Sequence, residues 1–177
     1  MNRRIVHLLV ALAFVLGSAQ SGLAVPVTWS LLGAVFSDAS TASGGFTFDA
    51  NTGLYSNVFI TTSAGPTIYT TNELNAIPFG TDQNGISLVD NFVPNNNAGK
   101  PILNFDFQAP LTNAGGSVLL VVNFPSFEGT CGAADCSSGG ITRVVTAGRV
   151  VTPEPATLAL VGVGLAALVF LRRKSED

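Results

Sequence analysis

Leu103-Asn104-Phe105-Asp106-Phe107-Gln108 is the stretch of this 177-residue chain that indicates its fold class most clearly. Apolar and polar side chains alternate along it, which is the pattern of a β-strand with one face in a hydrophobic core. Between residues 25 and 152, apolar runs with the helical period and capping residues are absent. We therefore expect an all-β domain around this strand.

The residues on its N-terminal side predict a β-hairpin. Phe46 and Phe48 share a face, Asp49-Ala50-Asn51-Thr52-Gly53 is rich in turn residues, and residues 54–62 run back. An earlier strand is expected to place four apolar side chains on one side: Val27, Trp29, Leu31 and Val35. These segments supply the first strands of the domain.

The residues on its C-terminal side predict further strands. Residues 117–124 are almost continuously apolar, as in a fully buried strand, and residues 141–146 and 148–151 form β segments with a glycine kink. Residues 72–85 and 92–101 have the composition of long loops. About seven or eight short strands favour a single β-sandwich over residues 25–151, with jelly-roll wiring as one option.

The N-terminal end has the features of a secretory signal peptide. Arg3 and Arg4 precede an uncharged apolar stretch, and small residues follow it. We expect residues 1–24 to be removed by cleavage after Ala24, with cleavage after Ala19 as the alternative. The only histidine of the chain, His7, falls in the removed segment.

The C-terminal end, residues 152–177, is a second unit of a different kind. The tripeptide Pro153-Glu154-Pro155 is followed by an uncharged apolar run at residues 156–171 and by Arg172-Arg173-Lys174. As a helix the run reaches about 24 Å, just short of the roughly 30 Å hydrocarbon core of a bilayer. The basic cluster is expected to stop transfer and stay in the cytoplasm, which places residues 25–151 outside the membrane.

The tripeptide, the apolar segment and the terminal basic cluster, together with the signal peptide, resemble those of bacterial proteins with a PEP-CTERM sorting signal. The resemblance implies recognition by a membrane-embedded exosortase that processes the tag near the tripeptide. It also implies release of the ectodomain towards the cell surface, the envelope or an exopolysaccharide matrix. Many such proteins carry valine before the tripeptide, where this chain has Thr152.

Charge and residue content exclude several function classes for residues 25–152. Eight acidic and three basic residues leave a formal charge of −5, which disfavours nucleic acid as a partner. Without histidine this region cannot form a Ser-His-Asp triad or a histidine zinc site. We therefore assign no catalytic residue, no metal site and no cofactor.

Carboxylates remain the one route to catalysis, because glycoside cleavage needs only two acids. Asp106 is the most suggestive, but an acid on a solvated sheet face explains it, and the same holds for Glu128 and Asp135. Residues 49–53 begin like a calcium loop, yet Gly53 comes one position early and Ile60 stands where the bidentate glutamate belongs. A hairpin turn explains them.

Cys131 and Cys136 are the only cysteines and lie in a loop rich in glycine and serine. In an exported protein a disulfide between them is the default expectation, and it would close a small loop. A metal site would need two further ligands, and a redox pair would have the Cys-x-x-Cys spacing. We expect the disulfide.

Two functions follow as hypotheses. The first is a non-enzymatic envelope or matrix protein, structural or associated with exopolysaccharide, for which Trp29, Tyr55 and Tyr69 are candidate sugar-contacting aromatics, although core packing also explains them. The second is a carboxylate-based hydrolase of surface polysaccharide. It requires two converging acids from this set: Asp38, Asp49, Asp82, Asp90, Asp106, Glu128 and Asp135.

Overall fold

Every regular element in the described part of the chain is a β-strand. The computed structural model describes residues 25–64, 68–70, 72, 74 and 81–153. The expectations for the signal peptide and Ala24, for Glu154 and Pro155, for the apolar run 156–171 and for Arg172, Arg173 and Lys174 lie outside these residues. Within the described ranges, no helix is long and apolar enough to cross a membrane.

The described residues form nine strands in one antiparallel sheet. They are β1 (Val27–Phe36), β2 (Thr41–Asp49), β3 (Leu54–Thr62), β4 (Ile68–Thr70), β5 (Gly85–Val89), β6 (Pro101–Asp106), β7 (Ser117–Leu119), β8 (Phe127–Cys131) and β9 (Gly139–Val151). Their order in the sheet is β4-β3-β2-β1-β9-β8-β6-β5, with β7 beside β9. Most neighbours in the sheet therefore follow one another in the chain, as in an up-and-down meander.

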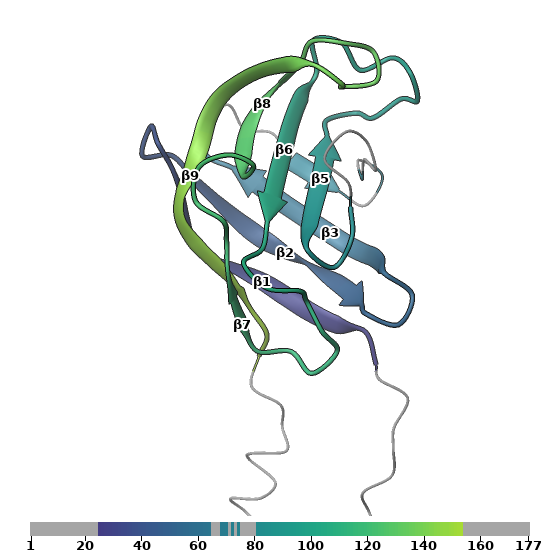
Figure 1. The fold of residues 1–177 in the computed structure, drawn as a ribbon, viewed down its shortest axis with the longest axis vertical. Helices are drawn as coiled ribbons and strands as arrows, with labels where there is room; N and C mark the ends of the chain where they lie inside the picture. The colour runs from purple at the N-terminus through teal and green to yellow at the C-terminus, as the bar shows by residue number, and fades with distance from the viewer. Residues whose placement is uncertain (1–24, 65–67, 71, 73, 75–80, 154–177) are drawn as a thin grey trace, which may run out of the picture.

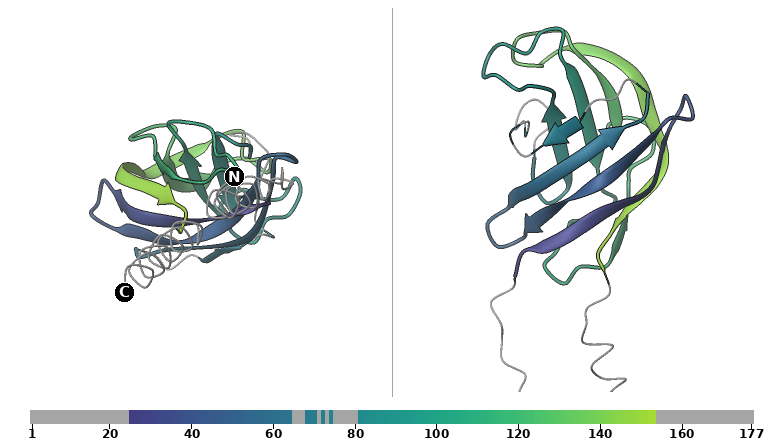
Figure 2. Two further views of the ribbon diagram at one scale, coloured as in Figure 1. Left: turned by 90° about the horizontal axis from the view of Figure 1, so that it is seen from below. Right: turned by 180° about the vertical axis from the view of Figure 1, so that it is seen from behind.

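The sheet wraps around itself because β9 belongs to both of its halves. The first part of β9 pairs with β8, and the last part pairs with β1 and β7. The two halves face each other across the core (Figures 1 and 2), and a bridge between Leu74 and Leu88 brings the outer edges together. The all-β prediction is confirmed, but the predicted sandwich of two sheets is replaced by one nearly closed sheet, and the strand order is not that of a jelly roll.

The bend of β9 occurs at a glycine that no other residue could replace without strain. Gly148 has a φ of +140°, and a Cβ there would lie 2.8 Å from the Ala34 Cα and 2.9 Å from a Leu120 methyl group. The predicted kink is confirmed, and the two predicted segments are one continuous strand of 13 residues.

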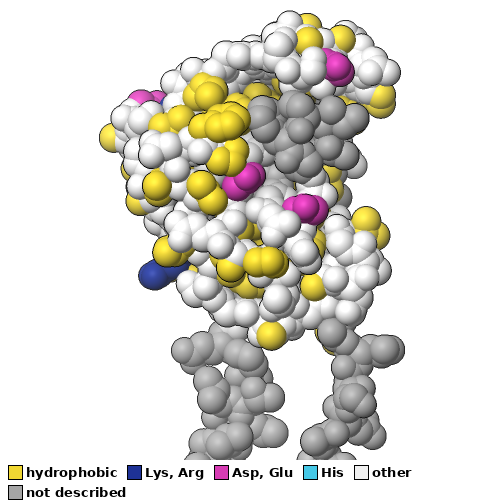
Figure 3. Space-filling view, in the orientation of Figure 1, with side chains coloured by type: hydrophobic (Ala, Val, Ile, Leu, Met, Phe, Trp, Pro, Cys, Tyr) yellow, Lys and Arg dark blue, Asp and Glu magenta, His cyan; other side chains and the backbone are white. Residues whose placement is uncertain are grey.

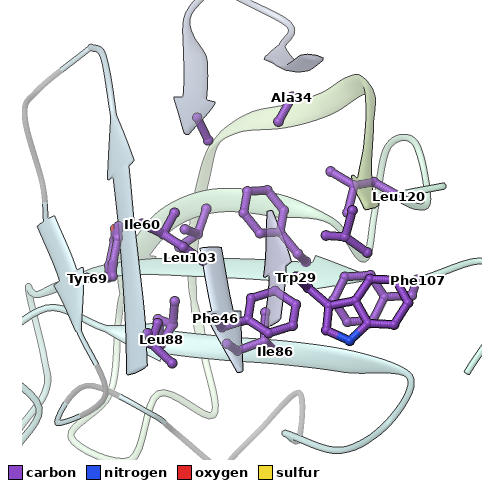
Figure 4. Close-up of a cluster of buried hydrophobic side chains, with 14 of the residues drawn as sticks. Trp29, Ala34, Phe46, Ile60, Tyr69, Ile86, Leu88, Leu103, Phe107 and Leu120 are labelled. Atoms are coloured by element: carbon purple, nitrogen blue, oxygen red, sulfur yellow. The ribbon is translucent and has the colours of Figure 1, made fainter. Parts of the chain in front are cut away.

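Aromatic and aliphatic side chains from both halves of the sheet fill the core (Figure 4). The predicted hairpin is confirmed: Phe46 and Phe48 are both buried, and Phe48 pairs with Tyr55 across the turn. The Gly53 N–H donates to the Asp49 carbonyl at 2.8 Å and closes that turn. This part of the sheet follows directly from the sequence pattern.

A bulge in β1 overturns part of the predicted first strand. Ser30 pairs with Gly45 and Ala34 pairs with Ala42, so β1 has one residue more than β2 between the two pairs. Gly33, with a φ of +64°, lies in this interval. The extra residue reverses the alternation, and Ala34 and Phe36 are buried where Val35 was expected.

The prediction of a fully buried strand at residues 117–124 is wrong. Only Ser117–Leu119 form a strand, which pairs with β9, and an isolated bridge joins the next residue, Leu120, to Phe107. Leu120 is buried, but Val122 and Phe124 are exposed because the chain leaves the sheet there. An apolar run is thus divided between an exposed edge strand and a surface loop.

Candidate functional site

The three aromatic residues proposed for sugar contact are not on the surface. Trp29 and Tyr69 are fully buried and Tyr55 nearly so, which makes all three part of the core. The Tyr55 hydroxyl donates to the Asp82 carbonyl at 2.8 Å, and burial, with smaller contributions from Asp82 and Asp106, raises the pKa of Tyr55. This part of the carbohydrate hypothesis is wrong, because no sugar can reach these rings.

Glu128 forms a buried ion pair with Arg143 instead of lying on a solvated face. Arg143 Nε donates to Glu128 Oε2 at 2.8 Å, and Arg143 Nη2 also binds this oxygen. Glu128 Oε1 accepts hydrogen bonds from Thr62 Oγ1 at 3.0 Å and from the Tyr69 hydroxyl at 3.2 Å. Both carboxylate oxygens are therefore occupied, as a buried charge requires.

Arg143 also reaches outward from this pair. Its Nη1 donates to Asp38 Oδ2 at 3.0 Å, its Nη2 donates to the Ala64 carbonyl at 2.9 Å, and its guanidinium lies 4.9 Å from the centre of the Phe36 ring. Burial alone would lower the pKa of Arg143, but the hydrogen bonds to Glu128 and Asp38 raise it. The cluster joins β8 and β9 to the opposite half of the sheet.

Asp106 is half-buried, which corrects the prediction of a solvated sheet face. Asn104 beside it is fully buried and donates from Nδ2 to Asp106 Oδ1 at 2.9 Å, and the Asp106 N–H donates to Ser126 Oγ at 3.0 Å. Burial raises the pKa of Asp106, and the nearby charge of Asp82 acts in the same direction. The outer face of β6 is therefore covered by the chain around residue 126.

Asp49 and Asp135 each bind backbone groups of the loop in which they lie. Asp49 Oδ1 accepts from the Asn51 N–H at 2.9 Å and from Asn113 Nδ2 at 3.1 Å, and these bonds, that of Asn51 first, lower the pKa of Asp49. Asp135 Oδ1 likewise accepts from the Ser137 N–H at 3.0 Å. Residues 49–53 form a hairpin turn, as the sequence indicates.

No group of three or more histidine, cysteine, aspartate or glutamate residues in the described ranges could hold a metal ion.

A groove of about 220 Å³ lies beside the disulfide between Cys131 and Cys136. Phe124 stacks on Phe127, with ring centres 6.0 Å apart, and is 60% exposed. Ile141 and the hydroxyl residues Ser137 and Ser138 also line the groove. Hydrophobic side chains gather on this face over β8 and β9 (Figure 3), and sequence reasoning missed the groove because its parts come from three separate segments.

The two ends of the described domain leave it at the same end of the molecule (Figure 1). Val151, the last residue of β9, pairs with Ser30 of β1 and with Ser117 of β7. The Thr152 N–H donates to the Gly116 carbonyl at 2.9 Å, and the Gly116 N–H donates to Thr152 Oγ1 at 2.8 Å. Pro153, the first residue of the tripeptide, is exposed and follows this contact directly.

Comparison with known families identifies the segment that follows β9. The family model of the PEP-CTERM protein-sorting motif matches residues 151–174. Neither the comparison with curated proteins nor that with solved structures gave a match. The motif is a C-terminal sorting signal of exosortase substrates, and its first matched residue, Val151, is also the last residue of β9. The chain is therefore a protein with a PEP-CTERM sorting motif at its C-terminal end.

Proposed function

We propose that the chain is an exported, non-enzymatic protein of the cell envelope or extracellular matrix, with a structural or exopolysaccharide-associated β domain. The observation that carries this proposal is the match of the sorting motif to residues 151–174, which begins at the last residue of β9. Its acids support a non-enzymatic role, because Asp38 and Glu128 bind Arg143, and Asp49 and Asp135 bind their own turns.

The groove beside the disulfide is the surface that suits a carbohydrate ligand best. The exposed face of Phe124 offers a sugar ring an apolar platform, and Ser137 and Ser138 place hydroxyl groups beside it. The β8–β9 turn that borders the groove lies at the end of the molecule opposite the two chain exits (Figure 1). The acidic character of the domain favours a neutral polysaccharide over an anionic one.

Delivery is tested by following the full-length chain in bacterial cells with and without an exosortase. We expect an exported product in the first strain whose mass ends near the tripeptide, and an unprocessed membrane-bound form in the second. Full-length protein confined to the inner membrane of both strains would contradict the proposal, and so would intact protein in the cytosol.

Ligand binding is tested with pull-down on neutral envelope polysaccharides. Phe124→Ala should abolish retention, whereas Phe59→Ala should not, because Phe59 is 56% exposed on β3 and lies outside the groove. If the wild-type domain binds no envelope polymer, the role is structural. If both variants bind as the wild type does, the groove is not the contact surface.

A carboxylate-based polysaccharide hydrolase is the second candidate, and one observation favours it. Burial raises the pKa of Asp106, and the charge of Asp82 contributes to this increase. A carboxyl with a raised pKa near a second carboxylate is the arrangement of a general acid and its partner in glycosidases. Against it, the Asp82 carboxylate accepts a hydrogen bond from the Asn84 N–H at 2.7 Å and is held in its turn. Release of reducing ends by the wild type that Asp106→Asn abolishes would support the hydrolase. No release at all would leave the binding role.

A further inference from the structure

The sorting motif begins inside the folded domain. Its first matched residue, Val151, lies in the sheet between Ser30 and Ser117, and its second, Thr152, binds Gly116. We propose that Thr152 is a positioning residue for processing. It holds the start of the motif against the sheet, so that the processing enzyme has access to the motif only from Pro153 onward. This inference rests on the proposed processing of the chain by an exosortase.

The contact of Thr152 is reciprocal. Its N–H donates to the Gly116 carbonyl at 2.9 Å, and its Oγ1 accepts the Gly116 N–H at 2.8 Å. The Oγ1 also lies 3.4 Å from the Gly116 carbonyl oxygen. The side chain therefore adds a second hydrogen bond to the single one that the backbone of Thr152 makes with Gly116.

The partner loop is shaped to receive this side chain. Gly115 has a φ of +70° and Gly116 a φ of +123°, which are backbone conformations that favour glycine. A Cβ on Gly115 would lie 2.6 Å from Thr152 Oγ1 and would push the hydroxyl out of its site. Gly115 thus leaves the space that Thr152 occupies.

Strand pairing explains why this contact limits access. A peptide that an enzyme binds in extended form needs free backbone groups on at least one edge. Val151 has no free edge, because β1 flanks it on one side and β7 on the other. The enzyme can bind residues before Pro153 only after β7 separates from β9 and Thr152 separates from Gly116, which is a local opening of the sheet.

The test compares processing rates of full-length variants by pulse-labelling in exosortase-containing cells. Thr152→Val keeps the shape and the backbone bond but removes Oγ1, and we expect processing to accelerate by about two- to tenfold, the range of one net hydrogen bond. Thr152→Ser keeps the hydroxyl and should be processed at the wild-type rate. Thr146→Val is the matched control, because Thr146 lies in β9 ahead of the motif and its hydroxyl donates to the Val35 carbonyl of β1 at 3.1 Å.

Gly115→Ala separates positioning from sequence recognition. It displaces the Thr152 side chain without changing any residue of the motif, so it should accelerate processing as Thr152→Val does. Acceleration by Thr152→Val alone would mean that the enzyme reads residue 152, and the inference would be overturned. Equal rates for all variants, or a mature product that ends before Thr152, would overturn it as well. Absence of processing in every variant and in the wild type would reject the proposed function itself.

Discussion

At the scale of single residues, Arg143 connects parts of the chain that are far apart in sequence. It binds Glu128, fifteen residues away, and Asp38, 105 residues away. Arg143 and Glu128 are both buried, so each needs the other, since an unpaired charge at this depth is strongly unfavourable. Asp38 lies at the rim and keeps 44% of its side chain exposed.

Arg143→Met should destabilise the domain by about 3–5 kcal/mol, because it leaves the Glu128 charge buried without its partner. The double variant Arg143→Met with Glu128→Leu should lose less than the sum of the two single variants. Urea unfolding of the domain measures the free energy of unfolding of each variant. Strict additivity would contradict the view that the two residues act as a pair.

Asp38 should make stability depend on acid pH. Hydrogen bonds from Ser40, with help from Arg143, lower its pKa from 3.8 to about 2 in the folded state. A lowered folded pKa means that the ionised form stabilises the fold. This contribution is complete above roughly pH 5 and is lost as the pH falls towards 2.

The variant Asp38→Asn should therefore be less stable than the wild type at pH 6, and the two should converge near pH 2. Melting temperatures across this range provide the measurement. A difference that stays constant with pH would show that the ionisation of Asp38 does not contribute to stability.

At the scale of elements, sequence patterns predicted strands in which apolar and polar residues alternate, and this includes β6, although the fold covers both of its faces. The β2–β3 hairpin was predicted in full, because alternation and turn residues agree there. Residues 117–124 are mostly apolar but lie largely at the surface, since β7 ends at Leu119 and the chain then leaves the sheet. Strands β5 and β8 are short and were not singled out, because both are buried on nearly every residue and show no alternation.

The candidate site was less predictable than the fold. The disulfide followed from the exported context, and the sorting motif from its own residues. The burial of Asn104 and Asp106 did not, because the side chains that cover them come from residues about 20 positions later in the chain. The groove around Phe124 depends on the same long-range packing, which local patterns do not encode.

Gly148→Ala tests the bend that lets β9 serve both halves of the sheet. A Cβ at a φ of +140°, 2.8 Å from the Ala34 Cα, should destabilise the domain by more than about 1 kcal/mol. Gly140→Ala in the same strand is the control, because a Cβ there meets nothing within 4 Å and should change stability little. Chemical unfolding compares the two, and equal effects would contradict the role assigned to the bend.

At the scale of the whole molecule, the chain forms a meander that nearly closes on itself. The first and last strands, β1 and β9, are neighbours in the sheet. Ser30 near the start of the domain therefore pairs with Val151 at its end. Closure by the terminal strands gives the fold its core, and it also brings the two chain exits together.

A circular permutant should fold if the exits lie as close as the β1–β9 pairing indicates. Residues 25 and 153 would be joined by a linker of about eight glycine and serine residues, and the chain opened in the exposed turn between Asn51 and Thr52. We expect cooperative thermal unfolding and an all-β circular dichroism spectrum. Opening the chain between Thr146 and Ala147 instead should abolish folding, because it interrupts β9. Failure of the first permutant would contradict the proximity of the exits.

The pairing of β1 with β9 has a consequence for a newly exported precursor. If the proposed leader and apolar tail both lie in the membrane, the domain between them is attached to one bilayer at two points. Because both attachments leave from the same end of the domain, the sheet can form without strain.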